Sequence, residues 1–231
     1  QLAVRVGGRP FFLQCPPYPY CELHTVLVET EHTPQSITRQ TLLDLADAAR
    51  QLAGVYICSN TDLSGTGASI LEHRHYQIVG KRLPVCDAKA VFTAATAAAE
   101  VAMLDFPTAA ARVRAPTEAA VVDAAAALLA AWRSPEMAAV LDVPLDTLTS
   151  SFMCSSSPVE GFEMTVIPRT QRNLTRESMK CIKSEFVGIL EAAGFGILPG
   201  RLKPELTRLF LDGEPPHGDL EKYAAWMDEL E

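Results

Sequence analysis

Residues 67–77 read GASILEHRHYQ and are the most informative stretch of this 231-residue chain. Residues 70–79, ILEHRHYQIV, follow a glycine-rich loop and predict a β-strand with histidines at alternating positions. Because side chains alternate along a strand, we expect His73, His75 and Gln77 to share one face. Buried polar side chains need a hydrogen-bond partner or a ligand. The pattern therefore favours a functional face, and a solvated sheet surface is the alternative.

The residue types in this stretch are suited to chemistry on phosphate groups. A neutral imidazole is a competent nucleophile toward phosphorus, and an ordinary pKa of ~6.5 leaves much of it neutral near pH 7. The loop before it contains Gly65, Gly67 and Ser69. Its backbone N–H groups and hydroxyl could reach phosphate oxygens. The combination predicts a nucleophile next to a phosphate-binding loop.

The sequence before this stretch predicts two strands, a helix and a further strand. Residues 10–14 and 24–29 are apolar or β-branched and read as strands. Residues 36–54 carry apolar side chains at helical spacing, begin at a Ser or Thr cap and end at a glycine. Residues 55–60 form the next short predicted strand. The order is strand, helix, strand, loop, strand.

The second half predicts more helix. The alanine-rich residues 91–106 fit a helix or a mixed structure, and residues 117–133 predict a helix capped by its first threonine. Residues 163–169 predict a strand, and residues 178–196 and 219–231 read as helical. Together these elements predict an α+β fold in which helices flank an antiparallel sheet.

Composition excludes several classes of protein. A hydrophobic content of 48% over this length is enough for a sizeable core in one or two domains. A formal charge of −8 argues against a general nucleic-acid binder and against a polybasic membrane-surface protein. No apolar run reaches the ~18 residues that span a bilayer, and the start lacks the order of a signal peptide. We therefore expect a cytoplasmic protein.

Six cysteines are scattered through the chain without a Cys-x-x-Cys pair. We expect reduced thiols that pack as small hydrophobic side chains.

Residues 67–77 resemble the His-x-His-x-Gln signature of galactose-1-phosphate uridylyltransferases, which are members of the histidine-triad superfamily. The bacterial type carries Gly-Gly-Ser-Ile-Leu-x-His-x-His-Tyr-Gln. Residues 9–37, 58–77 and 182–206 resemble, in order, the strand block, the catalytic loop and the C-terminal helix with its Leu-Pro-Gly-Arg-Leu turn. The resemblance implies a histidine-triad-like catalytic domain over residues 1–100 and a related C-terminal domain over residues 101–231.

The resemblance also implies a mechanism. His75 would displace a sugar 1-phosphate from a UDP-sugar and form a covalent uridylyl-imidazole, which a second sugar 1-phosphate then attacks. Gln77 would hydrogen-bond the phosphoryl group of the intermediate, and the backbone near His73 would orient the nucleophile. The implied enzyme is a hexose-1-phosphate uridylyltransferase that acts without a cofactor and forms a homodimer.

Further residues are assigned roles in binding substrates. The resemblance implies that Asn60, Gly67 and Ser69 contact the nucleotide phosphates. It also places Lys183 and Glu191 in the sugar-phosphate region, where a solvated helical face is the alternative. Beyond the predicted strand, Lys81 and Arg82 offer positive charge for phosphates, although exposed cations usually have no specific role.

Other matching residues have more open roles. His32 and His73 match positions that supply zinc ligands in some relatives, where two cysteines complete a tetrahedral site. Those cysteines are absent here, so a structural zinc is an alternative that the sequence leaves open. His24 matches a family histidine, and Tyr18 and Tyr20 match family aromatics; packing is the simplest reading for all three.

The sequence departs from the family in its second half and begins inside the family's longer N-terminal part. The family's histidines near a Pro-His-Asn-Thr stretch and a His-Pro-His cluster have no counterpart in residues 144–147 and 167–181. The base and the acceptor therefore stay open. A nucleotide phosphorylase or hydrolase with the same nucleophile is the second hypothesis, and a degenerate nucleotide-binding module is the third.

Overall fold

The computed structural model describes residues 2–171, 187–198 and 200–221. The chain divides into two compact units. One comprises residues 1–172 and 187–195, and the other comprises residues 173–186 and 196–231. The predicted sites that fall within the described residues all lie in the first unit.

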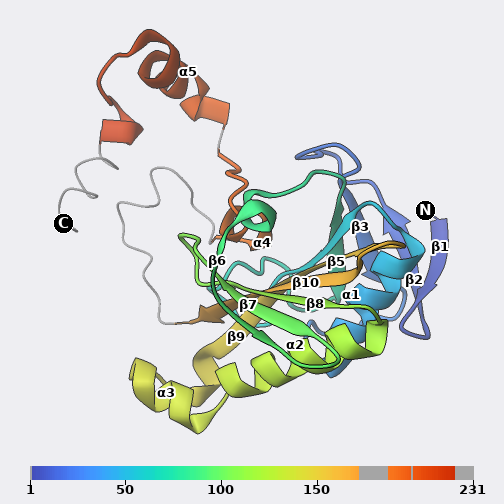
Figure 1. Ribbon diagram of the computed structural model, residues 1–231. Helices are drawn as coiled ribbons and strands as arrows, with labels where there is room; N and C mark the ends of the chain where they lie inside the picture. Colours follow the sequence, from blue (N-terminus) through green and yellow to red (C-terminus); the bar gives the residue numbers. More distant parts are fainter. Residues whose placement is uncertain (1, 172–186, 199, 222–231) are drawn as a thin grey trace. The chain divides into compact units, whose positions relative to one another are not determined.

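Ten strands of the first unit form one antiparallel sheet in the order β1-β2-β3-β5-β4-β9-β10-β8-β7-β6 (Figure 1). Their bounds are β1 (Leu2–Val6), β2 (Arg9–Gln14), β3 (Thr25–Glu29), β4 (Tyr56–Ser59), β5 (His75–Val79), β6 (Ala90–Ala95), β7 (Glu100–Leu104), β8 (Ala111–Ala115), β9 (Leu148–Ser157) and β10 (Gly161–Thr170). The predicted α+β class with an antiparallel sheet is confirmed. Strands on both sides of residue 100 join this sheet, and the division into domains at that residue stays a prediction.

Two helices cover one face of the sheet. They are α1 (Arg39–Gln51) and α2 (Glu118–Trp132), and a shorter helix, α3 (Pro135–Leu141), follows. At the start of α1, the hydroxyl of Thr41 accepts a hydrogen bond from the Thr38 N–H. At the start of α2, the hydroxyl of Thr117 accepts one from the Ala120 N–H. These caps confirm the predicted helix starts.

The core lies between these helices and the sheet. Its buried side chains include Leu42 and Leu45 from α1, Val121 from α2, and Phe152 and Tyr76 from the strands. Burial of an apolar side chain of this size stabilises a fold by ~1.5–3 kcal/mol. The opposite face is covered by loops, by a 3-10 turn (Pro84–Asp87) and by the short helix α4 (Ile189–Ala192), which contacts β4 and β9.

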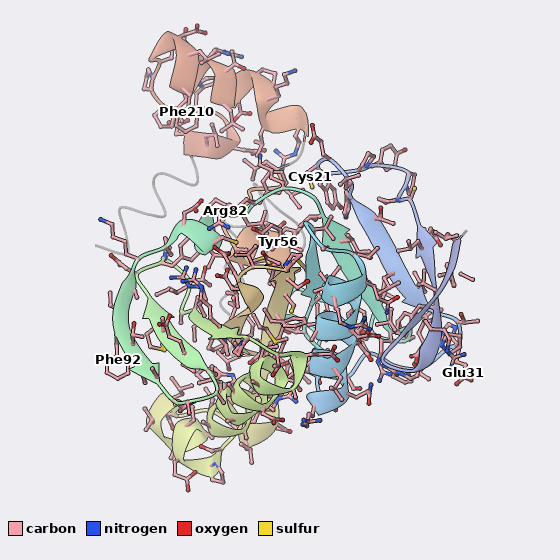
Figure 2. The ribbon with its side chains drawn as sticks, turned by 45° about the vertical axis from the view of Figure 1, so that its right-hand side comes forward. Cys21, Glu31, Tyr56, Arg82, Phe92 and Phe210 are labelled. Atoms are coloured by element: carbon pink, nitrogen blue, oxygen red, sulfur yellow. The ribbon has the colours of Figure 1, made fainter. Side chains whose placement is uncertain are left out.

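Two predicted elements differ in the structure. The strand predicted over residues 70–79 begins only at His75, because the backbone before it bonds to a loop: Gln35 N donates to Leu71 O and Arg74 N donates to Thr33 O, both at 2.8 Å. The alanine-rich residues 91–106 form β6 and β7 rather than a helix. Here strand pairing within the sheet overrides local helix propensity. All six residues of the edge strand β6 are exposed, including Phe92 (Figure 2).

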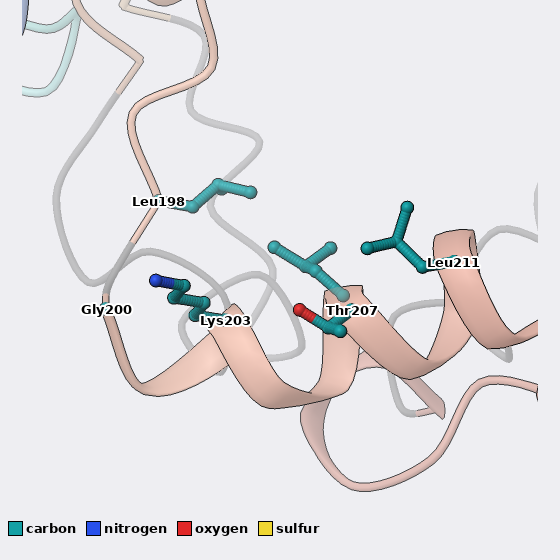
Figure 3. A pocket seen from close by; sticks show the side chains of 6 residues that line it. Leu198, Gly200, Lys203, Thr207 and Leu211 are labelled. Carbon is teal, nitrogen blue, oxygen red and sulfur yellow. The ribbon is translucent and has the colours of Figure 1, made fainter.

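The second unit is small. It contains α5 (Lys203–Thr207), which continues into a π-helical turn (Arg208–Asp212), and Leu202 and Leu220 are its buried apolar residues. A shallow pocket in it is lined by Leu198, Gly200, Lys203, Leu206, Thr207 and Leu211 (Figure 3). Its wall is mostly aliphatic and holds none of the predicted site residues. Among the described residues of the chain, no helix combines the length and apolarity needed to cross a bilayer.

Tyr76 links β5 to α1 through a buried hydrogen bond. Its hydroxyl donates to Asp44 Oδ2 at 2.6 Å, and the fully buried carboxylate also accepts from Gln40 and pairs with Arg9. Burial raises the pKa of Asp44, against the effect of these donors. Because Tyr76→Phe removes one donor from a buried acceptor, we expect it to lower the free energy of unfolding by ~1–3 kcal/mol in urea denaturation.

The control for this prediction is Tyr56→Phe. The Tyr56 hydroxyl accepts from the exposed Arg82 at 3.2 Å, and no buried carboxylate of the described residues depends on it as Asp44 depends on Tyr76. We expect a smaller loss there. Equal effects of the two substitutions would contradict the stabilising role of the Tyr76–Asp44 bond.

Candidate functional site

His75 and Gln77 lie on the sheet face opposite α1 and α2. Residues directly opposite each other on antiparallel strands point to the same face. One such row runs from Val26 through Gln77, Cys58, Met153 and Thr165 to Arg112. The intervening residues of β5, Tyr76 and Ile78, belong to the core beneath α1. Strand β5 therefore divides its side chains between the core beneath α1 and the opposite face, where His75 and Gln77 lie in rows that also hold apolar side chains such as Cys58 and Met153.

The ring of His75 is oriented by a backbone carbonyl. Its Nδ1 lies 2.9 Å from His73 O. A carbonyl oxygen only accepts hydrogen bonds, so Nδ1 carries the proton and Nε2 keeps its lone pair. Burial lowers the pKa of His75 below its ordinary value, and the bond to His73 opposes that shift. Both the tautomer and the charge state leave Nε2 available as a nucleophile near pH 7.

The backbone of His75 is held by Gln35, a residue that the sequence analysis did not single out. Gln35 Oε1 accepts from His75 N at 3.3 Å, and its Nε2 donates to Ser59 Oγ at 3.3 Å. Ser59 Oγ donates in turn to Asn60 O at 2.9 Å. The buried amide of Gln35 thus links the start of β5 to the end of β4. Nothing in the local pattern around Gln35 indicates this link.

Gln77 presents an unsatisfied group on the same face. Its Oε1 is buried and has no hydrogen-bond partner among the described residues. Leaving a buried polar atom without a partner costs ~1–3 kcal/mol. A ligand group that donates a hydrogen bond to this oxygen would recover that cost.

Asn60 and Gly67 both contact residues 187–189, where α4 begins. Asn60 Oδ1 accepts from Ile189 N at 2.8 Å, so any ligand contact falls to its NH2 group. Gly67 has a φ of +104°, and a Cβ there would lie 2.2 Å from Val187 O. Only glycine permits this close approach. Ser69, by contrast, is exposed at the outer side of the loop.

The start of the glycine-containing loop is fixed by Asp62. Its carboxylate accepts from Ile37 N at 2.8 Å, from Arg133 Nη2 at 2.8 Å and from the Thr149 hydroxyl at 2.6 Å. These partners come from three distant parts of the chain, so the sequence gives no local sign of the arrangement. The loop that precedes His75 is therefore anchored at both ends.

His32 and His73 stack, with ring centroids 4.3 Å apart and an interplanar angle of 19°. His73 Nε2 lies 2.7 Å from Glu29 O. The described residues contain no group of three His, Cys, Asp or Glu side chains placed to hold a metal ion. This donor set does not fit a four-ligand zinc site. The structural zinc stays a sequence-based prediction.

The predicted cations beyond β5 have protein partners. The Lys81 ammonium lies 4.7 Å above the centre of the Phe195 ring. Arg82 donates to Asp87 at 2.8 Å and to the Tyr56 hydroxyl at 3.2 Å (Figure 2). These contacts hold the two side chains near the surface, and their roles in binding phosphate stay predictions.

The remaining predicted residues are described only in part. Lys183 lies outside the described residues. Glu191 Oε2 accepts from Gly188 N at 3.0 Å and so closes the first turn of α4. His24 Nδ1 accepts from Tyr20 N at 3.1 Å, and the two rings stack with centroids 4.8 Å apart. The contact between His24 and Tyr20 fits the packing role expected for both.

The sequence is similar to curated enzymes along most of its length. Galactose-1-phosphate uridylyltransferase of Bifidobacterium longum is 33% identical over 222 residues, covering 89% of this chain and 43% of that protein. Those of Pediococcus pentosaceus and Streptococcus pneumoniae are 28% and 27% identical, each covering 99% of this chain and 50% of the relative. The chain thus spans about half the length of the curated relatives it matches. The resemblance indicated by residues 67–77 is confirmed.

The chain also matches one family of sequences and one solved structure. The sequence profile of a family described as a domain of unknown function (DUF4922) matches residues 2–80. Among solved structures, yeast Ap4A phosphorylase Apa2 matches with a TM-score of 0.45 and 18% identity, covering 71% of this chain and 57% of that one.

Proposed function

We propose that this relative of the galactose-1-phosphate uridylyltransferases carries a nucleotidyl-transfer site in which His75 is the nucleophile. The observation that carries the proposal is the bond between His75 Nδ1 and His73 O, which fixes the tautomer that leaves Nε2 free to attack. The similarity to enzymes of that name supports a UDP-sugar as donor and a hexose 1-phosphate as acceptor. It equally supports galactose metabolism as the setting.

The reaction follows from this geometry in two displacements. His75 Nε2 forms a bond to the α-phosphorus of the UDP-sugar, and the bond from that phosphorus to the bridging oxygen breaks. The sugar 1-phosphate leaves with the electron pair. A phosphate oxygen of the second hexose 1-phosphate then attacks the uridylyl-imidazole, and the electron pair of the P–N bond returns to Nε2. No net proton transfer is needed, because both leaving group and acceptor are phosphate anions.

The surrounding residues support each displacement. When Nε2 binds phosphorus, the ring becomes positively charged, and the His73 carbonyl stabilises that charge through the Nδ1 proton. The Gln77 NH2 group lies on the same face and can donate to a phosphoryl oxygen, whereas its buried Oε1 can only accept. We assign phosphate contacts to the Asn60 NH2 group and to the loop around Gly67 and Ser69.

An exchange experiment tests the proposal. Protein is incubated with UDP-glucose and isotopically labelled glucose 1-phosphate, with no other sugar phosphate present. Because the first displacement is reversible, we expect the label to enter UDP-glucose at a rate comparable with net turnover. Together with a uridylyl adduct on His75, this outcome identifies an intermediate that has released its sugar phosphate.

Two other outcomes have distinct meanings. Release of UMP without exchange of label would show that water is the acceptor and that the protein is a hydrolase. Absence of both exchange and nucleotide products, with UDP-glucose still bound, would contradict catalysis and leave a nucleotide-binding module.

A further inference from the structure

Arg169 is a partly buried cation on the same sheet face as His75. On β10, Thr165 belongs to the row that contains Gln77, and the paired register with β9 continues without a break through Arg169. Because side chains alternate, Arg169 points to the same side as Thr165. Neither the composition nor any motif marks this arginine, and the sequence analysis passed over it.

Half of the Arg169 guanidinium is satisfied. Its Nη2 donates to Val187 O at 2.6 Å, whereas Nη1 is buried and has no hydrogen-bond partner among the described residues. No carboxylate of the described residues pairs with it. Burial lowers the pKa of Arg169, which shows that the surroundings disfavour its charge. A buried charge is costly unless it is paired, so this position favours an anion.

The other partly or fully buried arginines of the first unit have more acceptors among the described residues, although Nε of Arg9, Arg74 and Arg112 also lacks one. Arg133 pairs with Asp62, and Arg74 pairs with Glu29. Arg112, which lies on the same face, donates to two carbonyl oxygens, those of Cys86 and Ala88. Arg169 has a single carbonyl. Arg169 therefore has fewer acceptors among the described residues than Arg74, Arg112 or Arg133, and it is the one of these four with a buried, unpartnered Nη group.

The end of β10 lies against the loop predicted to bind phosphate. The Val187 carbonyl that Arg169 bonds is the atom that a Cβ on Gly67 would strike. Two residues further along, Gln171 Nε2 donates to Ser64 O at 2.8 Å. Three strand spacings, ~14 Å, separate the backbones of β5 and β10. Arg169 is thus beside the loop but set apart from the nucleophile.

We propose that Arg169 binds the sugar-bearing phosphate, the group next to the one that His75 attacks. It would hold this phosphate in the UDP-sugar, in the departing hexose 1-phosphate and in the acceptor that replaces it. The inference rests on the proposed function. A guanidinium suits this task because it presents two parallel N–H donors to two phosphate oxygens.

A binding experiment separates this phosphate from the rest of the nucleotide. Calorimetry measures the Kd values of UMP and UDP-glucose for His75→Ala protein, which binds without turnover, with and without Arg169→Ala. UMP lacks the second phosphate. We expect Arg169→Ala to raise the Kd of UDP-glucose at least ~10-fold and to change the Kd of UMP by no more than ~2-fold. Arg169→Lys, which keeps the charge, should recover part of the loss.

The control is Arg114→Ala, which removes a half-exposed arginine of β8 paired with Glu163. It should leave both Kd values unchanged. An equal rise in the Kd values of UMP and UDP-glucose in Arg169→Ala protein would show that the residue only supports Val187. Unchanged Kd values would show that it does not contact the ligand. Either result overturns this inference and leaves the proposed function standing.

Two further results complete the design. Failure of the His75→Ala protein to bind either nucleotide, while Arg169 is intact, would overturn the proposed function and the inference with it. Should Arg169→Ala fail to fold, the Arg169→Lys protein carries the same comparison, and a selective loss of UDP-glucose over UMP is again the expected result.

Discussion

His75→Ala is expected to abolish the covalent uridylyl adduct and to slow label exchange by a factor on the order of 10⁴ or more, the scale seen when a catalytic nucleophile is removed. The expected loss of activity depends on one atom of the nucleophile, Nε2. Nε2 of His75 has its lone pair because Nδ1 is bonded to His73 O at 2.9 Å, and alanine supplies no replacement. Intact mass spectrometry after incubation with UDP-glucose and an alkaline quench, which preserves a phosphoramidate, measures the adduct directly.

The chain offers a matched control for this substitution. His217 Nδ1 lies 3.3 Å from Pro215 O, which is the same two-residue contact that orients His75. His217 belongs to the second unit, and His75 to the first. His217→Ala should keep the adduct. An adduct that persists in His75→Ala protein would identify another nucleophile and contradict the mechanism.

The pH dependence of adduct formation follows from the same environment. Burial lowers the pKa of His75, and only the neutral ring attacks. The rate should therefore be level at pH 7 and above, and should fall only as the pH drops through a value below ~6.5.

Local patterns were enough to predict the elements around the nucleophile. Strands β2 and β3 and helix α1 follow from alternation, helical spacing and the Thr38 cap, all of which act over a few residues. The separation of His75 from Tyr76 follows from the strand period alone. These features need no knowledge of which segments pair.

Features that depend on contacts between distant segments were not predicted from the sequence. His73 falls outside β5 because Arg74 N donates to Thr33 O, a contact between segments about 40 residues apart. Gln35, Asp62 and Arg169 act through partners 18 to 87 residues away in sequence. The alanines of β6 and β7 favour a helix in isolation, yet they form strands because the sheet supplies hydrogen-bonding partners at β8. Pairing, rather than propensity, decided these cases.

Gln77→Ala is expected to lower kcat for exchange by ~10²- to 10³-fold, because a donor aimed at charge that develops on a phosphoryl group is worth a few kcal/mol. We expect the substitution to leave the fold and its stability unchanged. Gln77 Oε1 has no partner among the described residues, so the substitution breaks no hydrogen bond of that oxygen, and thermal unfolding should shift little. Steady-state exchange kinetics and melting curves on the same preparation measure the two quantities.

Gln14→Ala is the control for Gln77→Ala, because both glutamines lie in one row of the same face: Gln14 pairs with Val26, and Val26 pairs with Gln77. Gln14 is exposed at the end of β2, so its loss should change neither rate nor stability. Gln77→Glu should be slower than Gln77→Ala, because a carboxylate would repel the phosphoryl oxygens that the amide attracts. A fall in kcat that is matched by a fall in stability would assign Gln77 to packing and contradict its role in transfer.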